Sequence, residues 1–180
     1  MIRSYKHSVL RPEVEVEDSV DRIVAQWAQV RPDLDVSPMA IIGRLSKLTR
    51  IFERALQDVF IQHDLQPGEF DLLATLRRNG AGTRGMTAGE LAESAMVTSG
   101  AITNRLDRLV AKALVTRAAD PLSRRTIRVT LTEQGLTVVD QTLVDHVANE
   151  GQLLSSLNAE QREELESMLR DLLFAQESRS

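Results

Sequence analysis

The chain has 180 residues, of which 42% are hydrophobic and 27% are charged, and its formal net charge is −4. It contains no cysteine, which excludes a thiol switch, a structural disulfide and a thiolate metal site. Its apolar runs are too short to span a bilayer and its N-terminus lacks a signal-peptide core, so we expect a cytoplasmic protein with no membrane partner.

The N-terminal half of the sequence predicts helices separated by proline-containing breaks. Residues 1–17 are polar, without a helical period, and are interpreted as a flexible arm. Asp18 or the serine after it is placed to cap a short helix that carries Trp27. A long helix is expected from Met39 to His63, and a third helix opens near Pro67 and closes at Gly80.

The run from Met86 to Gly135 predicts two helices joined by a tight turn and followed by a two-stranded ribbon. Thr87 and Glu90 form a capping box that opens the first helix. The second helix is capped at Thr98 or Ser99 and extends to about residue 112. Its apolar residues cluster on one face and are expected to pack inward: Ile102, Leu106, Leu109 and Val110.

The ribbon is expected to pair strands at 114–118 and 126–132, with Ile127, Val129 and Leu131 alternating towards a buried face. The connection between the strands is interpreted as too long for a two-residue turn, and it ends in Arg124 and Arg125. Arginines at the tip of a ribbon are suited to DNA phosphates or to the minor groove. The ribbon and the preceding helices therefore predict a winged helix-turn-helix.

Two further helices are expected after the ribbon, the second beginning near Asn158 with Gln161 completing a capping box. The helices on both sides of the winged region carry more apolar surface than that small region can bury. A homodimer interface is the expected destination of this surface, and an intramolecular core is the alternative.

The predicted fold class is mainly α, a winged helix-turn-helix with long N- and C-terminal dimerisation helices. We divide the chain into four segments by function. They are a flexible N-terminal arm (1–17), N-terminal helices with the ligand pocket and part of the dimer interface (18–85), the winged helix-turn-helix (86–135) and the C-terminal dimerisation helices (136–180).

Positive charge is concentrated in the predicted DNA-binding segment. From Gly100 to Arg128 there are seven basic and two acidic residues, a local net charge of +5 that leaves −9 for the remainder. A basic patch on an acidic body is typical of a DNA-binding surface, although a basic run alone is more often a solvated face.

The outward face of the second helix supplies the candidate base contacts. Asparagine can form paired hydrogen bonds with adenine, and arginine can do so with guanine. Small residues at the start of the helix let it approach the major groove closely. The predicted DNA-binding residues on the helix and the ribbon are Ser99, Thr103, Asn104, Arg108, Arg124 and Arg125.

In these features the chain resembles the multiple antibiotic resistance regulator (MarR) family, over roughly residues 40–175. The order of helices matches, as does the wing pattern RR-x-x-x-V-x-L-T-x-x-G that runs from Arg124 to Gly135. The resemblance implies an obligate dimer with two reading helices in successive major grooves of a palindromic operator. Members usually have aspartate before the arginine pair, where this chain has Ser123, and Asp120 is near enough to substitute.

A narrower resemblance is to the urate-responsive PecS-like and HucR-like branch of that family. The branch has a tryptophan in an extra N-terminal helix, an aspartate early in the supporting helix, and arginines in the reading helix and at the start of the wing. Trp27, Asp71, Arg105 and Arg117 match these positions. The resemblance implies that they form the effector site.

The residues themselves are compatible with an anion site. Arg105 lies to the side of its helix's apolar face, so a partly buried guanidinium there needs an anionic partner, and Asp71 is the nearest candidate. A small flat anion could compete for Arg105 and Arg117, accept a hydrogen bond from Trp27 and shift the reading helix. The alternatives are a core tryptophan, a structural Asp71–Arg105 pair and a phosphate contact from Arg117.

The function expected from the sequence is a ligand-responsive transcriptional regulator, most simply a repressor, released by a small anion such as urate. Polycarboxylates such as aconitate or citrate are an alternative effector class, and an architectural DNA-binding protein without ligand is an alternative function. No nucleophile motif, phosphate-binding loop or metal-ligand spacing is present, so we expect no enzyme activity, no metal and no cofactor.

Overall fold

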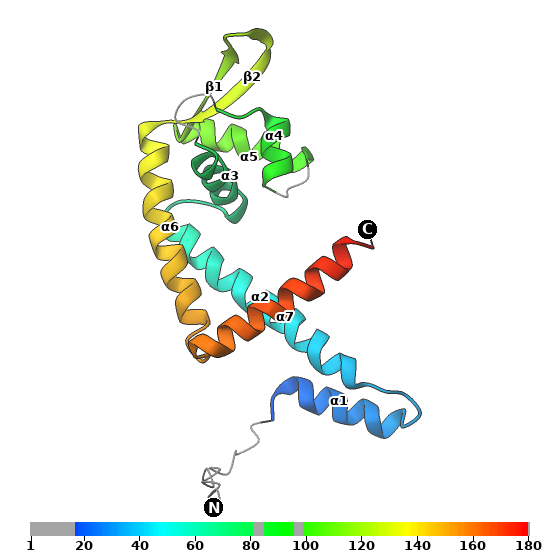
Figure 1. The fold of residues 1–180 in the computed structure, drawn as a ribbon. Coiled ribbons are helices and arrows are strands. Elements are labelled where there is room, and N and C mark those ends of the chain that lie inside the picture. The colour runs from blue at the N-terminus through cyan, green and yellow to red at the C-terminus, as the bar shows by residue number, and fades with distance from the viewer. Residues whose placement is uncertain (1–16, 81–84, 96–98, 180) are drawn as a thin grey trace, which may run out of the picture. The chain divides into compact units, whose positions relative to one another are not determined.

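The computed structural model describes residues 17–80, 85–95 and 99–179, with the side chains of 99–101 and 124 outside the description. The described elements follow one another as α1 (Ser19–Val30), α2 (Ser37–Gln62), α3 (Pro67–Arg78), α4 (Ala88–Ser94), α5 (Ser99–Ala111), β1 (Val115–Asp120), β2 (Ser123–Leu131), α6 (Glu133–Leu153) and α7 (Ala159–Glu177) (Figure 1). The mainly helical fold class with one two-stranded sheet is confirmed. The chain divides into two compact units, residues 1–51 and 52–180. No described helix is both long and apolar enough to cross a membrane.

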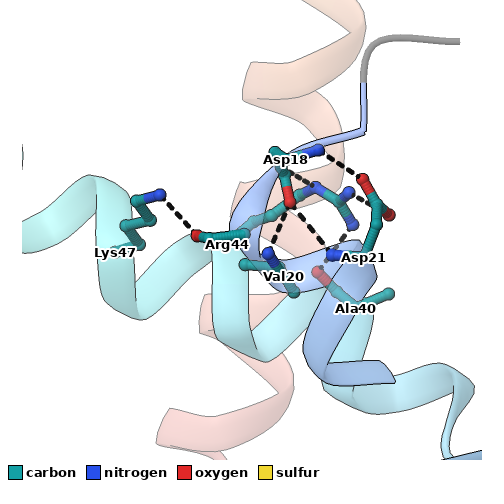
Figure 2. A network of polar contacts seen from close by, with 7 residues as sticks. Asp18, Val20, Asp21, Ala40, Arg44 and Lys47 are labelled. Atoms are coloured by element: carbon teal, nitrogen blue, oxygen red, sulfur yellow. Dashed lines mark hydrogen bonds and ion pairs between the residues drawn. The ribbon is translucent and has the colours of Figure 1, made fainter. Parts of the chain in front are cut away.

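In the first unit, polar contacts fasten the start of α1 to α2 (Figure 2). Of the two predicted candidates, Asp18 is the N-cap of α1, and it forms a capping box with Asp21. Arg44 of α2 reaches both carboxylates, with its Nε 2.9 Å from Asp18 Oδ2 and its Nη2 2.5 Å from Asp21 Oδ1. Below this network Val20 is buried against Gly43. The ion pairs and the apolar contact together hold the two helices.

The second unit is organised around a core shared by α3, α4, α5, α6 and the hairpin. α3 starts with Pro67 in its first turn and ends before Gly80, which has a φ of 69°, close to the predicted boundaries. Every helix and strand of the unit between α3 and α6 contributes a fully or almost fully buried side chain. The large apolar side chains of these elements that are at most 2% exposed are Leu72, Leu73, Leu76, Leu91, Ile102, Leu106, Leu109, Val115, Val129 and Val139.

The hairpin is longer than the sequence suggests. β1 and β2 pair antiparallel from Val115 opposite Leu131 to Asp120 opposite Ser123, so only residues 121–122 connect them. The expectation of a longer connection is therefore wrong. The Asp120 carboxylate accepts the backbone N–H of Leu122 at 2.8 Å, and this contact stabilises the short turn.

The expected inward alternation along β2 holds only near the core. Val129 is buried, but Ile127 is 49% exposed. Ile127 pairs with Ala119 close to the tip, where the hairpin extends beyond the helices that cover Val129. The expectation that Ile127 is buried is therefore wrong.

The last two helices expose most of their apolar residues. In α6, Leu136, Val139, Leu143 and Val147 recur at spacings of three or four residues, and of these Val139 is buried while the other three are exposed. α7 begins with the predicted Asn158–Gln161 capping box. Its large apolar residues are exposed in the single chain: Met168, Leu169, Leu172, Leu173 and Phe174.

Candidate nucleic-acid interface and ligand pocket

The helix pair α4 and α5 forms as the capping pattern predicts. The Glu90 backbone N–H donates to Thr87 Oγ1 at 3.1 Å, and the Thr87 backbone N–H donates to Glu90 Oε2 at 2.7 Å. This reciprocal bonding satisfies two amide groups at the start of α4. Leu91 then packs into the core beside Ile102 of α5. The predicted capping residue Thr98 lies outside the described residues.

The faces of α5 are divided largely as the sequence predicts. Ile102, Leu106 and Leu109 are buried, whereas Thr103 and Asn104 are exposed. Val110 was expected inward, but it is 40% exposed because it lies at the edge of the buried stripe near the helix end. The side chain of Ser99 lies outside the description. Thr103 and Asn104 are therefore accessible from solvent, and their contact with DNA bases stays a prediction.

Arg108 occupies a more constrained position than a freely extended DNA contact. Its Nε donates to Glu69 Oε1 at 2.7 Å, and the Arg108 side chain is 43% exposed. Lys112 also contacts Glu69, with Nζ 3.1 Å from Oε2. Burial would raise the pKa of Glu69, but hydrogen bonds from Arg108, the Gln66 backbone and Lys112 hold it below the ordinary value.

The hairpin is tied to α4 by a second buried charge cluster. Arg128 Nε donates to Asp120 Oδ2, and its Nη1 lies 3.2 Å from Glu90 Oε2 and 3.1 Å from the Gly85 carbonyl oxygen. Arg128 is therefore occupied within the protein. Arg125 is exposed on the hairpin, and the side chain of Arg124 lies outside the description.

These contacts revise the interpretation of the basic patch. Arg108 and Lys112 pair with Glu69, Arg117 with Asp107, and Arg128 with Asp120 and Glu90. Much of the local positive charge is thus opposed inside the fold. The distribution of charge along the sequence therefore overstates the positive charge that this segment presents to solvent.

Comparison with known proteins identifies the family. A MarR family model matches residues 63–126. The transcriptional regulator PecS of Dickeya dadantii (strain 3937) is 37% identical over 150 residues, which cover 83% of this chain and 90% of PecS. The chain belongs to the MarR family. It is therefore a DNA-binding transcriptional regulator, with α4, α5 and the hairpin as its winged helix-turn-helix.

Solved structures of MarR proteins share this fold. A variant of MarR from Escherichia coli complexed with operator DNA is similar with a TM-score of 0.65 and 26% identity, covering 82% of this chain and 97% of that one. BpsR of Bordetella bronchiseptica, whose DNA binding is regulated by 6-hydroxynicotinic acid, is similar with a TM-score of 0.63 and 21% identity. That match covers 73% of this chain and 97% of BpsR.

The four candidate effector residues of this MarR protein are distributed over both units. Trp27 lies on α1 in the first unit and is 45% exposed, so it is not a core anchor within the single chain. Asp71, Arg105 and Arg117 belong to the second unit. Arg117 Nη1 donates to Asp107 Oδ1 at 2.6 Å, which ties β1 to α5.

Arg105 lies against the N-terminal turn of α3. A Cβ atom added to Gly68 would lie 2.2 Å from Arg105 Cζ, so the guanidinium fills the space that this glycine leaves open. Burial raises the pKa of Asp71, and the positive charge of Arg105 is the largest influence opposing that rise. The two residues therefore interact electrostatically, although among the described contacts there is no ion pair between them.

A cavity of about 830 Å³ lies beside Asp71, between α3 and α6. Phe70 and Leu143 give it apolar surface, while Asp71, Arg78 and His146 give it polar groups. Arg105 and Arg117 do not line it. Sequence reasoning missed both Arg78 and His146 as lining residues. Asp71 and Arg78 lie seven positions apart on one face of α3.

Within the described residues, no group of three histidine or acidic side chains could hold a metal ion. His146 is instead part of an aromatic stack, with its ring centroid 5.4 Å from that of Phe60 and 5.0 Å from that of Phe70. Its Nε2 lies 3.2 Å from Glu150 Oε1. The cavity therefore combines an aromatic wall with charged groups, a composition suited to a small planar ligand.

Proposed function

We propose that this MarR-family regulator is a repressor that binds a palindromic operator as a homodimer and is released by a small anionic metabolite. The observation that carries the proposal is the arrangement of α5. Three buried side chains fix its inner face, while Thr103 and Asn104 remain exposed beside a hairpin that presents Arg125. A helix held in this way can enter the major groove while the hairpin contacts the backbone.

The proposed dimer is supported by the exposed apolar residues of α7. Monomeric proteins rarely expose a large apolar patch. One face of α7 exposes Met168, Leu169, Leu172 and Leu173, which recur at spacings of three and four residues. A second copy of the chain would cover such a surface and would place two α5 helices about one turn of DNA apart, roughly 10 base pairs. Sedimentation at micromolar concentration should therefore give twice the monomer mass.

We propose Asp71, Arg105 and Arg117 of the second unit as effector-binding residues, and Trp27 of the first unit as a further candidate. Arg105 is part of α5, so an anion that captures its guanidinium would act directly on the reading helix. An effector that prefers a shape unable to bind DNA lowers DNA affinity by linkage. Urate is the favoured effector because a planar anion can use both arginines and the indole. Aconitate and citrate remain the alternative class.

Operator binding is tested by selecting a duplex from a random library and titrating it against the protein in fluorescence anisotropy. Selected DNA should bind at least a thousandfold more tightly than scrambled DNA. Asn104→Ala should lower this ratio, and Arg125→Ala should weaken binding to both duplexes. Equal affinity of the wild type for both duplexes would contradict the proposal and favour the architectural alternative.

Effector binding is tested with urate, xanthine, citrate and aconitate. Trp27 is the only tryptophan, so its fluorescence reports on the proposed site directly. Urate should change the emission and dissociate the protein–operator complex, and Arg105→Ala should abolish the dissociation. If none of the four compounds changes either signal, the assignment of this site is wrong, while operator binding is judged separately.

A further inference from the structure

Glu69 is a buried carboxylate between α3 and α5, and it accepts three hydrogen bonds. Arg108 Nε donates to Oε1 at 2.7 Å, while Lys112 Nζ and the Gln66 backbone N–H both donate to Oε2 at 3.1 Å. The Glu69 side chain is 0% exposed, whereas the Arg108 side chain is 43% exposed. The carboxylate thus holds one edge of a guanidinium whose remainder reaches solvent.

The buried face of α5 is formed by residues other than Arg108. Ile102, Leu106 and Leu109 are buried in the core and already fix the helix against α3 and the hairpin. A buried ion pair is weak evidence for stability, because the cost of desolvating both charges offsets much of their attraction. The contact between Glu69 and Arg108 is therefore better explained by its effect on the orientation of Arg108 than by a contribution to folding stability.

The effect on Arg108 is orientation. Guanidinium is a rigid planar fork, so a hydrogen bond at Nε sets the direction of both Nη groups. Within the part of the chain that the structure describes, these Nη groups make no hydrogen bond or ion pair. A side chain that is already held loses less rotamer freedom when it binds a partner.

We infer that Glu69 is a positioning residue that orients Arg108 for contact with an operator base, and this inference rests on the proposed operator binding. The exposed Nη groups suit the paired acceptors of guanine in the major groove. Lys112 supplies a second positive charge to the carboxylate, and Lys112 also lies 3.5 Å from Asp64. Glu69 of α3, Arg108 of α5 and Lys112, which follows the end of α5, thereby form one cluster in which Arg108 is the residue directed at DNA.

The test is a double-mutant cycle of Glu69→Gln, Arg108→Ala and both together, measured on selected and scrambled duplexes. Glutamine keeps an acceptor for the α3 capping box but removes the charge that holds Arg108. Glu69→Gln should lower the preference for selected DNA about tenfold, the size of one good base contact. In the Arg108→Ala background the same change should have no further effect.

Two readouts separate positioning from a general structural role. Glu69→Gln should leave the salt dependence of binding unchanged, because no phosphate contact is lost. The control is Glu166→Gln, which makes the same change in an exposed ion pair with Arg170 on α7. This control should leave the preference for selected DNA unchanged. If Glu69→Gln does not fold, Glu69→Asp takes its place in the cycle, since the shorter carboxylate withdraws from Arg108 while keeping its charge.

Several results would overturn the inference. An unchanged preference in the Glu69 variant would do so, as would an equal loss with and without Arg108, because the effect would then not pass through Arg108. A reduced salt slope in Arg108→Ala would show that Arg108 contacts a phosphate rather than a base. If the wild type itself shows no preference for selected DNA, operator binding fails first, which is a distinguishable outcome.

Discussion

Arg128 and Asp120 form an ion pair across the hairpin, with side-chain exposures of only 12% and 7%. The same Asp120 carboxylate accepts the backbone N–H of Leu122 at the hairpin turn. Arg128 continues to Glu90 on α4, so the chain of contacts runs from the hairpin tip to the helix-turn-helix. Asp120 thus anchors the hairpin of this chain, three positions before Ser123.

Replacing Asp120 with asparagine should destabilise the second unit. Removing one partner of a buried ion pair leaves the other charge uncompensated, at a cost of about 3–5 kcal/mol. Urea denaturation should show a lower midpoint than the wild type. As the matched change in an exposed pair, Asp33→Asn removes the partner of Arg31 and should shift the midpoint little. Equal shifts in the two variants would contradict the anchoring role of Asp120.

The contrast between capping residues and charge partners shows what the sequence can predict. The sequence predicts the capping boxes at Thr87 and Asn158 correctly, because a capping box depends on residues three positions apart. It narrows the cap of α1 to two residues, of which Asp18 is the one observed. The partner of Arg108 is 39 positions away, on another helix, and Glu69 has the same local pattern as any acidic first-turn residue. Its role depends on how α3 packs against α5.

Gly135 at the start of α6 should tolerate no side chain. A Cβ atom there would lie 1.9 Å from the backbone carbonyl oxygen of Leu114, which cannot move away as a flexible side chain can. We expect Gly135→Ala to destabilise the protein by about 1–3 kcal/mol or more. Thermal unfolding followed by circular dichroism measures the change.

Gly151 provides the control for that experiment, because it lies in the same helix and nothing is within 4 Å of its added Cβ. Alanine there should stabilise the helix by about 0.5–1 kcal/mol, since glycine is less favourable than alanine inside a helix. Opposite signs for the two alanine variants are the expected outcome. Destabilisation of similar size in both would indicate that the contact with Leu114 is not responsible.

Gly68→Ala should separate effector response from folding. The atom displaced by the new methyl group is the end of the flexible Arg105 side chain, so the fold should survive while the guanidinium moves. We expect near-normal operator binding but dissociation by urate only at severalfold higher concentration. Anisotropy of the operator complex during a urate titration measures both. Unchanged urate sensitivity would show that the position of Arg105 against Gly68 does not matter for the response.

The candidate effector residues illustrate a second limit of sequence reasoning. The order of Asp71, Arg105 and Arg117 along the chain can be compared with a family pattern. The residues that Arg105 and Arg117 contact in the fold cannot be read from that order. Arg117 of β1 forms an ion pair with Asp107 of α5, whereas Arg105 of α5 packs against Gly68 of α3. These contacts form because the hairpin and α3 pack against different sides of α5. The cavity beside Asp71 likewise arises only when α6 packs against α3.

Asp71 should make effector binding depend on pH. Burial raises the pKa of its carboxyl above the ordinary value, with Arg105, His146 and Arg78 opposing that rise. The ionised form is therefore disfavoured in the folded state, and an anion bound nearby disfavours it further. Urate affinity should rise as the pH falls through the range in which Asp71 takes up a proton, because binding is then coupled to proton uptake.

The variant Asp71→Asn removes this coupling, so urate should bind it more tightly at neutral pH and with a flatter pH dependence. Its stability gain over the wild type should likewise be largest at neutral pH and should vanish as acid protonates Asp71 in the wild type. Titrations followed by Trp27 emission at a series of pH values measure the first effect, and urea denaturation measures the second. Parallel pH profiles would show that Asp71 does not face the bound anion, and the proposed site would then exclude it.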